Sequence, residues 1–305
     1  MTWLNDTLQG IFVGGGYALT AVGLSLMFGV MRLVNLAHGD LAVCATYLVT
    51  TVMAALGMPF LAALLLMLPV AFAAGAVLQL TLFDRALRTG PLAPLLVTFG
   101  LSIMIQNLLQ QTYSANVRGV PAGSIDVSAA HLGGLVLPWL SVLKLVLALV
   151  VIGGLSAALR FTGWGRRVRA TSDDVAMARL QGIRVRPLFA SVTGIAIAAA
   201  ALAGTLGAVT TGVYPTLGTL TLIFAFEAVV IGGLGSLWGT LLGGILIGVT
   251  QVLVSQVSVP YAILASQLLF LLVLVVRPQG LFGTAQADGQ ATGQAPMPAS
   301  TGVQA

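Results

Sequence analysis

The chain has 305 residues, of which 58% are hydrophobic and only 7% are charged, and its formal net charge is +5. A soluble domain carries about 25% charged residues, so the composition excludes a soluble enzyme or binding module, and most of the chain must meet lipid. The basic balance could indicate a nucleic-acid partner, but the positive charge lies between hydrophobic segments. The positive-inside bias of membrane proteins accounts for it better, so we expect no nucleic-acid partner.

Hydrophobic segments long enough to be membrane helices, which need about 20 apolar residues, follow one another along the whole chain. The predicted segments are Leu8–Met31, Leu36–Leu56, Pro59–Phe83, Pro91–Tyr113, Leu137–Leu159, Leu188–Thr210, Leu217–Ile231, Leu237–Val257 and Tyr261–Val276. The second follows the first with almost no loop, and the seventh is short and carries Glu227, so either could be broken or re-entrant. We predict an all-α polytopic integral membrane protein with eight or nine transmembrane helices.

Basic residues between the segments predict the orientation. Arg85 and Arg88 follow the third segment, seven of the thirteen Lys and Arg residues lie between Arg160 and Arg186, and Arg277 follows the last segment. An even number of segments separates each group from the next, so all three lie on one side, which should be the cytoplasm. With nine helices the N-terminus is outside and the C-terminus is cytoplasmic.

The sequence divides into one membrane domain and a polar tail. Residues 1–282 hold every hydrophobic segment, together with a cytoplasmic loop at 160–187 that we call the arginine loop. Residues 283–305 are rich in Gly, Ala, Gln, Thr and Pro without hydrophobic periodicity, which predicts a disordered cytoplasmic tail.

Motifs for nucleotide or metal chemistry are missing. Lys144 is the one lysine and lies in a hydrophobic segment, so the phosphate-binding pattern G-x-x-x-x-G-K-[ST] is absent. Gly232–Gly239 is rich in glycine but does not match G-x-G-x-x-G, and a turn between closely packed helices explains it better. His38 and His131 are far apart, and no cluster has metal-ligand spacing. We expect no enzyme, no metal and no cofactor bound by this chain.

The arginine loop contains the pattern of a short amphipathic helix. Ser172 can cap it, Asp173 and Asp174 fall in its first turn, where the helix dipole favours acids, and Gly182 can end it. A connector lying on lipid headgroups and a helix that docks into a partner's groove both fit this pattern.

Five stretches resemble the branched-chain amino acid permeases of ATP-binding cassette (ABC) importers, in particular the shorter of that system's two permease subunits. The stretches are 35–40, 96–107, the arginine loop, 232–244 and 277–282. They run from the first hydrophobic segment to the last, so the resemblance covers nearly the whole chain up to about Gly283. The departures are Asp40, where many members carry Glu, and Trp238, where Pro is common.

The resemblance implies a permease subunit in the cell (inner) membrane that translocates branched-chain or related amino acids. Its partners would be two ATPase subunits that hydrolyse ATP, a second permease subunit, and an extracytoplasmic solute-binding protein, all working at the lipid bilayer. The second permease would be a longer relative or another copy of this chain. The alternatives are a urea- or amide-type ABC permease, an ATP-independent secondary transporter, or a channel for a small solute.

The resemblance also assigns roles to residues. The helix of the arginine loop would couple ATP hydrolysis to transport through Asp173, Asp174, Ala176, Ala178, Arg179, Leu180, Gly182 and Ile183. Its small residues would permit close approach of an ATPase, and flanking arginines could pair with ATPase carboxylates.

Polar residues inside the hydrophobic segments are candidates for the translocation pathway. Asn35, His38 and Asp40 could line it, or they could cap a break between two helices at the cytoplasmic interface. Glu227 could pair with an arginine or a backbone amide, or could sense the substrate's ammonium group. A further set could line a wet face or join helices by hydrogen bonds: Thr98, Ser102, Gln106 and Asn107. We expect Lys144 to extend to the outer interface.

Overall fold

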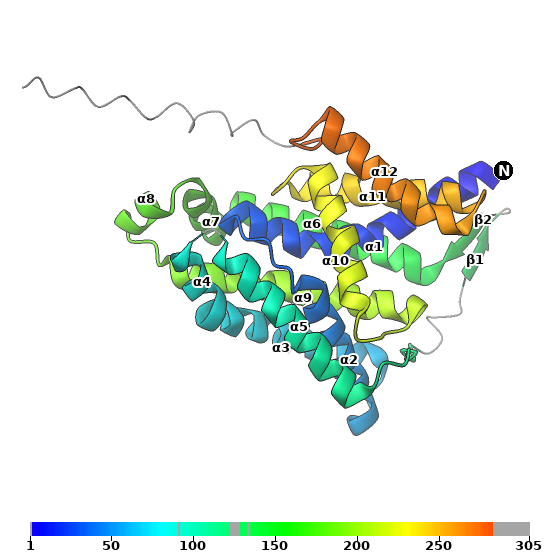
Figure 1. Cartoon of the computed structure of the whole chain (residues 1–305), viewed down its shortest axis with the longest axis horizontal. Helices are drawn as coiled ribbons and strands as arrows, with labels where there is room; N and C mark the ends of the chain where they lie inside the picture. The colour runs from blue at the N-terminus through cyan, green and yellow to red at the C-terminus, as the bar shows by residue number, and fades with distance from the viewer. Residues whose placement is uncertain (1, 91, 123–128, 133–134, 283–305) are drawn as a thin grey trace, which may run out of the picture.

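A computed structural model describes residues 2–90, 92–122, 129–132 and 135–282, and these form a bundle of helices (Figure 1). The elements are α1 (Thr2–Met31), α2 (His38–Leu56), α3 (Phe60–Leu78), the π-helical turn η1 (Gln79–Phe83), α4 (Asp84–Thr89), α5 (Ala93–Tyr113), β1 (Ala129–Leu132), β2 (Leu135–Pro138), α6 (Trp139–Phe161), α7 (Gly163–Asp173), α8 (Val175–Leu180), α9 (Val185–Thr211), α10 (Leu217–Gly232), α11 (Leu237–Ser255) and α12 (Val259–Val276).

The prediction of a polytopic helical membrane protein is confirmed. Among the described residues, eight helices are long and apolar enough to cross a membrane, and α10 is apolar but shorter. Every predicted segment corresponds to a helix, with ends that differ by up to six residues. The antiparallel pairing of β1 with β2, between α5 and α6, was not predicted. The predicted disordered tail, 283–305, lies outside the described residues.

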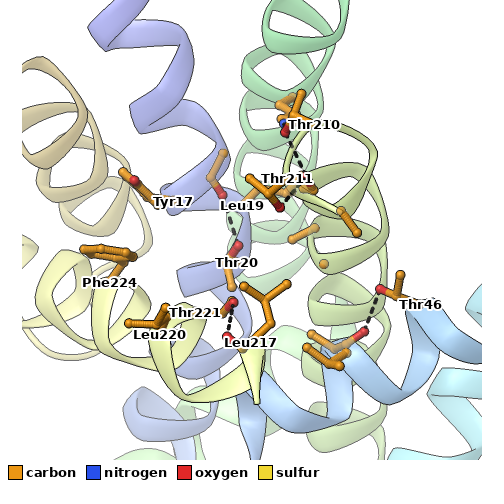
Figure 2. A pocket seen from close by; sticks show the side chains of 18 of the residues that line it. Tyr17, Leu19, Thr20, Thr46, Thr210, Thr211, Leu217, Leu220, Thr221 and Phe224 are labelled. Atoms are coloured by element: carbon orange, nitrogen blue, oxygen red, sulfur yellow. Dashed lines mark hydrogen bonds between the residues drawn. The ribbon is translucent and has the colours of Figure 1, made fainter. Parts of the chain in front are cut away.

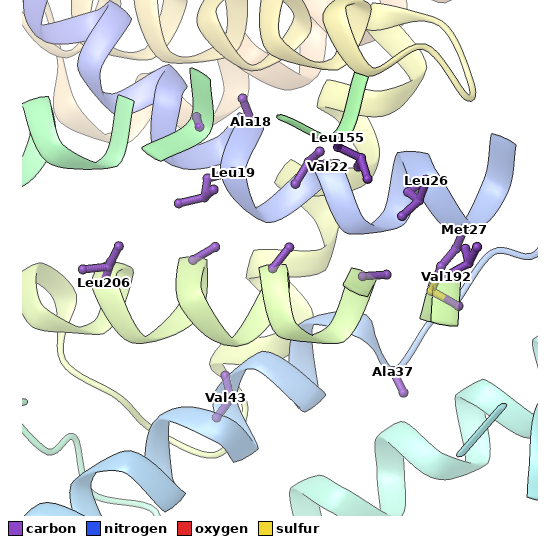
Figure 3. Packing of buried hydrophobic residues seen from close by; sticks show 14 of the residues in the cluster. Ala18, Leu19, Val22, Leu26, Met27, Ala37, Val43, Leu155, Val192 and Leu206 are labelled. Carbon is purple, nitrogen blue, oxygen red and sulfur yellow. The ribbon is translucent and has the colours of Figure 1, made fainter. Parts of the chain in front are cut away.

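Two long antiparallel helices, α1 and α9, form the centre of the bundle. Figure 3 shows Leu19, Val22 and Met27 of α1 facing α9, with Leu206 near one end of the contact and Val192 near the other. All five side chains are buried. Burial of this kind favours protein packing over lipid contact, so α1 and α9 are the scaffold on which the other helices are placed.

Each central helix has a closely packed neighbour. Gly14 of α1 lies against Gly244 and Gly248 of α11, and Gly75 of α3 lies against Gly194 of α9. A Cβ atom at any of these positions would come within 3.0 Å or less of its neighbours. Small residues let membrane helices approach until their backbones touch, which gains van der Waals contact where no hydrophobic effect is available.

After each central helix the chain is not helical for a few residues, and a shorter helix then begins. Residues 32–37 join α1 to α2, and residues 212–216 join α9 to α10. The first turns of α2 and α10 meet inside the bundle, where the backbones at Gly39 and Gly218 touch. Paired starts of short helices inside a membrane protein are a common arrangement at transporter binding sites.

One end of the bundle carries the arginine loop, α4 and residues 277–282, the described segments that the sequence predicts to be cytoplasmic. Figure 1 shows α7 and α8 at one end, and the N-terminus with β1 and β2 at the other. Arg186, at the start of α9, pairs with Asp84 of α4 at 3.2 Å. After α12, the amides of Leu281 and Phe282 donate to the carbonyls of Ile231 and Gly232 at 2.9 and 3.1 Å.

The glycine-rich segment forms the predicted turn between closely packed helices. Gly233 and Gly235 have φ angles of 103° and 85°, which favour glycine. Ser236 then caps α11 by accepting the amide of Gly239 at 3.1 Å. Gly235 also touches Gly29 near the end of α1, so this turn lies at the same end of the bundle as α7.

Candidate functional site

The arginine loop folds as two helices, of which α7 is anchored to the membrane bundle. Thr162 caps α7 by accepting an amide of its first turn at 3.0 Å. The indole N–H of Trp164 donates to Ser191 Oγ of α9 at 2.9 Å. The Arg169 guanidinium donates to the carbonyl of Leu159 in α6. Because α7 is bonded to both α6 and α9, it must move with them.

A second helix, α8, begins at Asp174. The Asp174 carboxylate accepts the amides of Ala176 and Met177 at 2.7 and 3.0 Å, which is the geometry of a helix N-cap. The predicted cap was wrong: Ser172 lies within α7 and donates to a carbonyl of that helix. Asp173 is the last residue of α7 and therefore does not lie in the first turn of α8.

Gly182 ends α8, as predicted. Its φ of +78° lies in the left-handed region. The amide of Ile183 donates to the carbonyl of Ala178 at 3.0 Å, and the amide of Gly182 donates to that of Arg179 at 3.0 Å. These two bonds make a Schellman motif, which stops the helix and turns the chain toward α9.

The exposed face of α8 is apolar at two positions. Met177 is 58% exposed and Leu180 is 82% exposed, whereas Ala178 is only 2% exposed. The expectation that Ala178 contacts a partner is therefore corrected, because its side chain packs inward. Ala176 and Arg179 are exposed beside the two apolar side chains. A docking partner would meet Met177 and Leu180 first.

A polar cluster lies where α2, α5 and α10 meet. Asp40 Oδ2 accepts the Ser102 hydroxyl at 2.5 Å, and Asp40 Oδ1 accepts the Gln106 amide at 3.1 Å. Gln106 also donates to Thr219 Oγ1 of α10 at 3.1 Å. The Asp40 side chain is buried against the backbone of Gly218. Three predicted pathway residues are thus brought together on one carboxylate.

Asn35 and His38 hold the break between α1 and α2. Asn35 Oδ1 accepts the amide of Ala37 at 3.1 Å, and His38 Nε2 bonds the carbonyl of Thr20 at 3.1 Å. Thr20 lies 11 residues from the end of α1 at Met31, or about 16 Å along the helix. The break is therefore deep in the bundle, which contradicts one of the two alternatives from the sequence, a capped break at the cytoplasmic interface.

The remaining predicted pathway residues lie elsewhere. Thr98 donates to a carbonyl of its own helix at 2.9 Å. Asn107 is exposed and also bonds its own helix. Glu227 is 2% exposed and accepts the side-chain amide of Gln267 in α12, instead of an arginine or a backbone amide. The predicted set is therefore not a single site around Asp40.

A cavity of about 590 Å³ lies among α1, α2, α6, α9 and α10 (Figure 2). Most of its wall is apolar, and hydroxyl groups interrupt it. Lys144 of α6 lines this cavity, and its ammonium donates to Thr210 Oγ1 of α9 at 3.2 Å. The sequence placed Lys144 at the outer interface and did not predict the cavity. A single lysine in an apolar segment was the available signal.

No group of three or more His, Cys, Asp or Glu side chains that could hold a metal occurs in the part of the chain that the structure describes.

The comparisons with known proteins agree with one another. The family model described as branched-chain amino acid transport system / permease component matches residues 7–277. The high-affinity branched-chain amino acid transport system permease protein BraD of Pseudomonas aeruginosa is 31% identical over 299 residues, which cover 94% of this chain and 97% of the relative. The corresponding LivH protein of Escherichia coli is 28% identical over 305 residues, with the same two coverages.

One further match covers only part of the chain. The fructose import permease protein FrcC of Rhizobium meliloti is 32% identical over 180 residues, which cover 52% of this chain and 47% of the relative. No solved structure matches the chain. The apolar helices and the permease relatives identify a multi-pass protein of the cell inner membrane. The chain belongs to the family of permease components of branched-chain amino acid transport systems.

Proposed function

We propose that this chain works in an ABC importer as the permease subunit that moves branched-chain or related amino acids across the inner membrane. An extracytoplasmic binding protein delivers the substrate, and two separate ATPase subunits hydrolyse ATP. The family match and the names of the relatives support this substrate class. A second permease subunit, either a longer relative or another copy of this chain, completes the pathway.

The main support for the proposal is the structure of α8. A six-residue helix with a side-chain cap and a Schellman end presents two exposed apolar side chains, Met177 and Leu180. Exposed arginines surround it, among them Arg179. An amphipathic helix of this kind fits a groove on a partner protein. Because α7 is bonded to α6 and α9, a partner that moves α8 also moves membrane helices.

The proposed orientation in the membrane follows from the basic residues at the end of the bundle that carries α8. The arginine loop, α4 and Arg277 lie together there, and short cytoplasmic loops collect basic residues. The ATPases would then dock on α8 from the cytoplasm. The N-terminus of the chain and the first residues of α6 lie at the opposite end of the bundle, which would be extracytoplasmic.

We place the translocation pathway along the face formed by α2, α5 and α10. Asp40, Ser102 and Gln106 form a polar cluster deep in the bundle. Thr219 of α10 is exposed and bonds Gln106 of this cluster, and Asn107 of α5 is exposed as well. Exposed polar groups at membrane depth are stable only against protein or water. A second permease subunit facing this surface would enclose it.

A test of the coupling site uses the complete transporter. The double variant Met177→Asp, Leu180→Asp should lose co-purification with the ATPase subunits and lose ATP-dependent uptake, because charges replace both apolar contacts. A matched control is Val257→Asp, since Val257 is 86% exposed and lies at the other end of the bundle. Normal ATPase association in the double variant would refute α8 as the docking site. Uptake by the chain alone, indifferent to ATP, would refute the importer itself.

A neutral solute is the second candidate, because one relative is named a fructose import permease. Competition of labelled leucine uptake by excess fructose, urea or isoleucine would separate the candidates. Inhibition by isoleucine alone supports the amino acid.

A further inference from the structure

We propose that the cavity among α1, α2, α6, α9 and α10 binds the carboxylate of a small amphiphilic solute, and that Lys144 is its specificity-determining residue. The proposal deepens the proposed function, on which it rests, by naming the group of the substrate that this chain recognises.

The charge at Lys144 has no protein counter-ion in the described parts of the chain. The ion pairs found there join Asp84 to Arg88 and Arg186, at the opposite end of the bundle. A lysine ammonium has three donors, and among the described residues Lys144 makes one hydrogen bond, to the hydroxyl of Thr210. A cation held within a membrane helix is costly unless an anion or a wet cavity compensates it. A bound carboxylate would supply that compensation.

The hydroxyl groups of the cavity are arranged as acceptors. Thr20 donates its proton to a carbonyl of α1 at 3.1 Å, Thr221 to a carbonyl of α10 at 3.0 Å, and Thr210 to a carbonyl of α9 at 2.8 Å. Each oxygen keeps lone pairs that a donor can use. Figure 2 shows these threonines around the cavity. One positive donor and several neutral acceptors match a zwitterion, whose carboxylate and ammonium need opposite partners.

The rest of the wall suits an aliphatic side chain. Leu19, Val43, Leu220 and Phe224 line the cavity. Its volume of about 590 Å³ falls within the range of roughly 300 to 1,000 Å³ that is usual for small-molecule sites. A sugar or urea would leave the ammonium without an anion and would bring hydroxyl or amide groups against apolar walls, which is unfavourable. The cavity therefore favours an apolar carboxylate over either neutral solute.

The position of the cavity agrees with this role. Lys144 lies near the start of α6 and Thr210 near the end of α9, whereas α7 and α8 join the opposite ends of the same two helices. In the proposed orientation the cavity lies at the extracytoplasmic end, where a binding protein would release its ligand.

The test measures leucine binding to the purified transporter in lipid nanodiscs without its binding protein. Lys144→Met keeps the apolar stem and removes the charge. This variant loses a hydrogen bond between charged groups and should therefore bind leucine at least about 10-fold more weakly. Lys144→Arg should restore most of the affinity. The matched control is Arg118→Met, which removes a cation that bonds Tyr113 outside the cavity and should leave affinity unchanged.

Two ligand analogues identify the group that Lys144 recognises. In the unmodified protein, 4-methylpentanoate, which keeps the carboxylate, should compete with leucine better than 3-methylbutylamine, which lacks it. The difference should disappear in Lys144→Met. Equal leucine affinity in Lys144→Met and the unmodified protein would overturn the inference while leaving ATP-driven leucine uptake, and so the proposed function, intact. Phospholipid that co-purifies with the unmodified protein but not with Lys144→Met, and that leucine does not displace, would also overturn it. Identical thermal unfolding midpoints of Lys144→Met and the unmodified protein would show that the variant is correctly folded.

Discussion

Replacing Gly39 by alanine would put a methyl group where the first turns of α2 and α10 touch. A Cβ atom at position 39 would lie 2.8 Å from the carbonyl carbon of Gly218 and 3.1 Å from the amide nitrogen of Leu222, and closer still to the Gly218 oxygen. All three are backbone atoms and cannot rotate away. Ordinary van der Waals contact begins near 3.4 Å, so clearing the carbonyl carbon alone takes roughly 0.6 Å of separation, and clearing the nearer oxygen takes more.

The expected cost is that of overpacking, about 1–3 kcal/mol in the free energy of unfolding. The separation also stretches the bridge in which Gln106 donates to both Asp40 of α2 and Thr219 of α10. The matched control is Gly153→Ala in α6, where a Cβ would meet nothing within 4 Å. That control should gain up to about 1 kcal/mol, because alanine has the higher helix propensity. The same Gly→Ala change should therefore lower the free energy of unfolding at position 39 and raise it at position 153.

The measurement is unfolding in mixed detergent micelles, followed by far-ultraviolet circular dichroism. Gly39→Ala that is as stable as Gly153→Ala would refute the contact between α2 and α10. The double variant Gly39→Ala, Gly218→Ala adds a second test. Because one separation relieves both clashes, the double variant should lose less than the sum of the two single losses. Additive losses would mean that the two glycines do not share one contact.

Three further variants test the end of the bundle that carries the arginine loop. Asp174→Ala removes the cap of α8 and should cost about 1 kcal/mol, seen as faster amide exchange over residues 175–183; unchanged exchange would exclude the cap. Trp164→Phe removes the donor to Ser191 and should lower unfolding free energy by about 1 kcal/mol, and an unaltered unfolding curve would contradict this. Asp84→Asn loses the ion pairs with Arg88 and Arg186, which should lower the free energy of unfolding by less than about 1 kcal/mol. High salt screens such pairs, so the variant and the unmodified protein should then be equally stable; a loss of stability that persists in high salt would contradict this.

Features that depend on local composition could be predicted from the sequence. The apolar length of each segment determines whether it can span a bilayer, and the predicted helix ends agree with the structure to within six residues. Gly182 could be identified as the end of α8, because its left-handed conformation favours glycine. The turn at 232–239 could be identified for the same reason.

Features that depend on which way a side chain faces could not be predicted. The helices of this protein are apolar on all sides, so periodicity does not show which face of α6 carries Lys144 inward. Its partner Thr210 is 66 residues away in the chain. The depth of the break at His38 depends in the same way on its bond to Thr20. Asp40 could be selected as polar, but its partners on α5 follow only from packing.

Local signals also failed where several residues offered the same chemistry. Ser172, Asp173 and Asp174 can all cap a helix. The choice falls on Asp174 because α7 continues through Asp173, stabilised by its bonds to α6 and α9. Tertiary contacts of the preceding helix therefore decide where the next one begins.

The two proposed sites are linked by the same pair of helices. At one end α7 is bonded to α6 through Arg169 and to α9 through Trp164. At the other end α6 is bonded to α9 through Lys144 and Thr210, beside the cavity. Helices are stiff along their axes, so a displacement of α7 that changes the angle between α6 and α9 must also change the distance between Lys144 and Thr210. A partner acting on α8 therefore has a direct mechanical route to the cation that we assign to the substrate carboxylate.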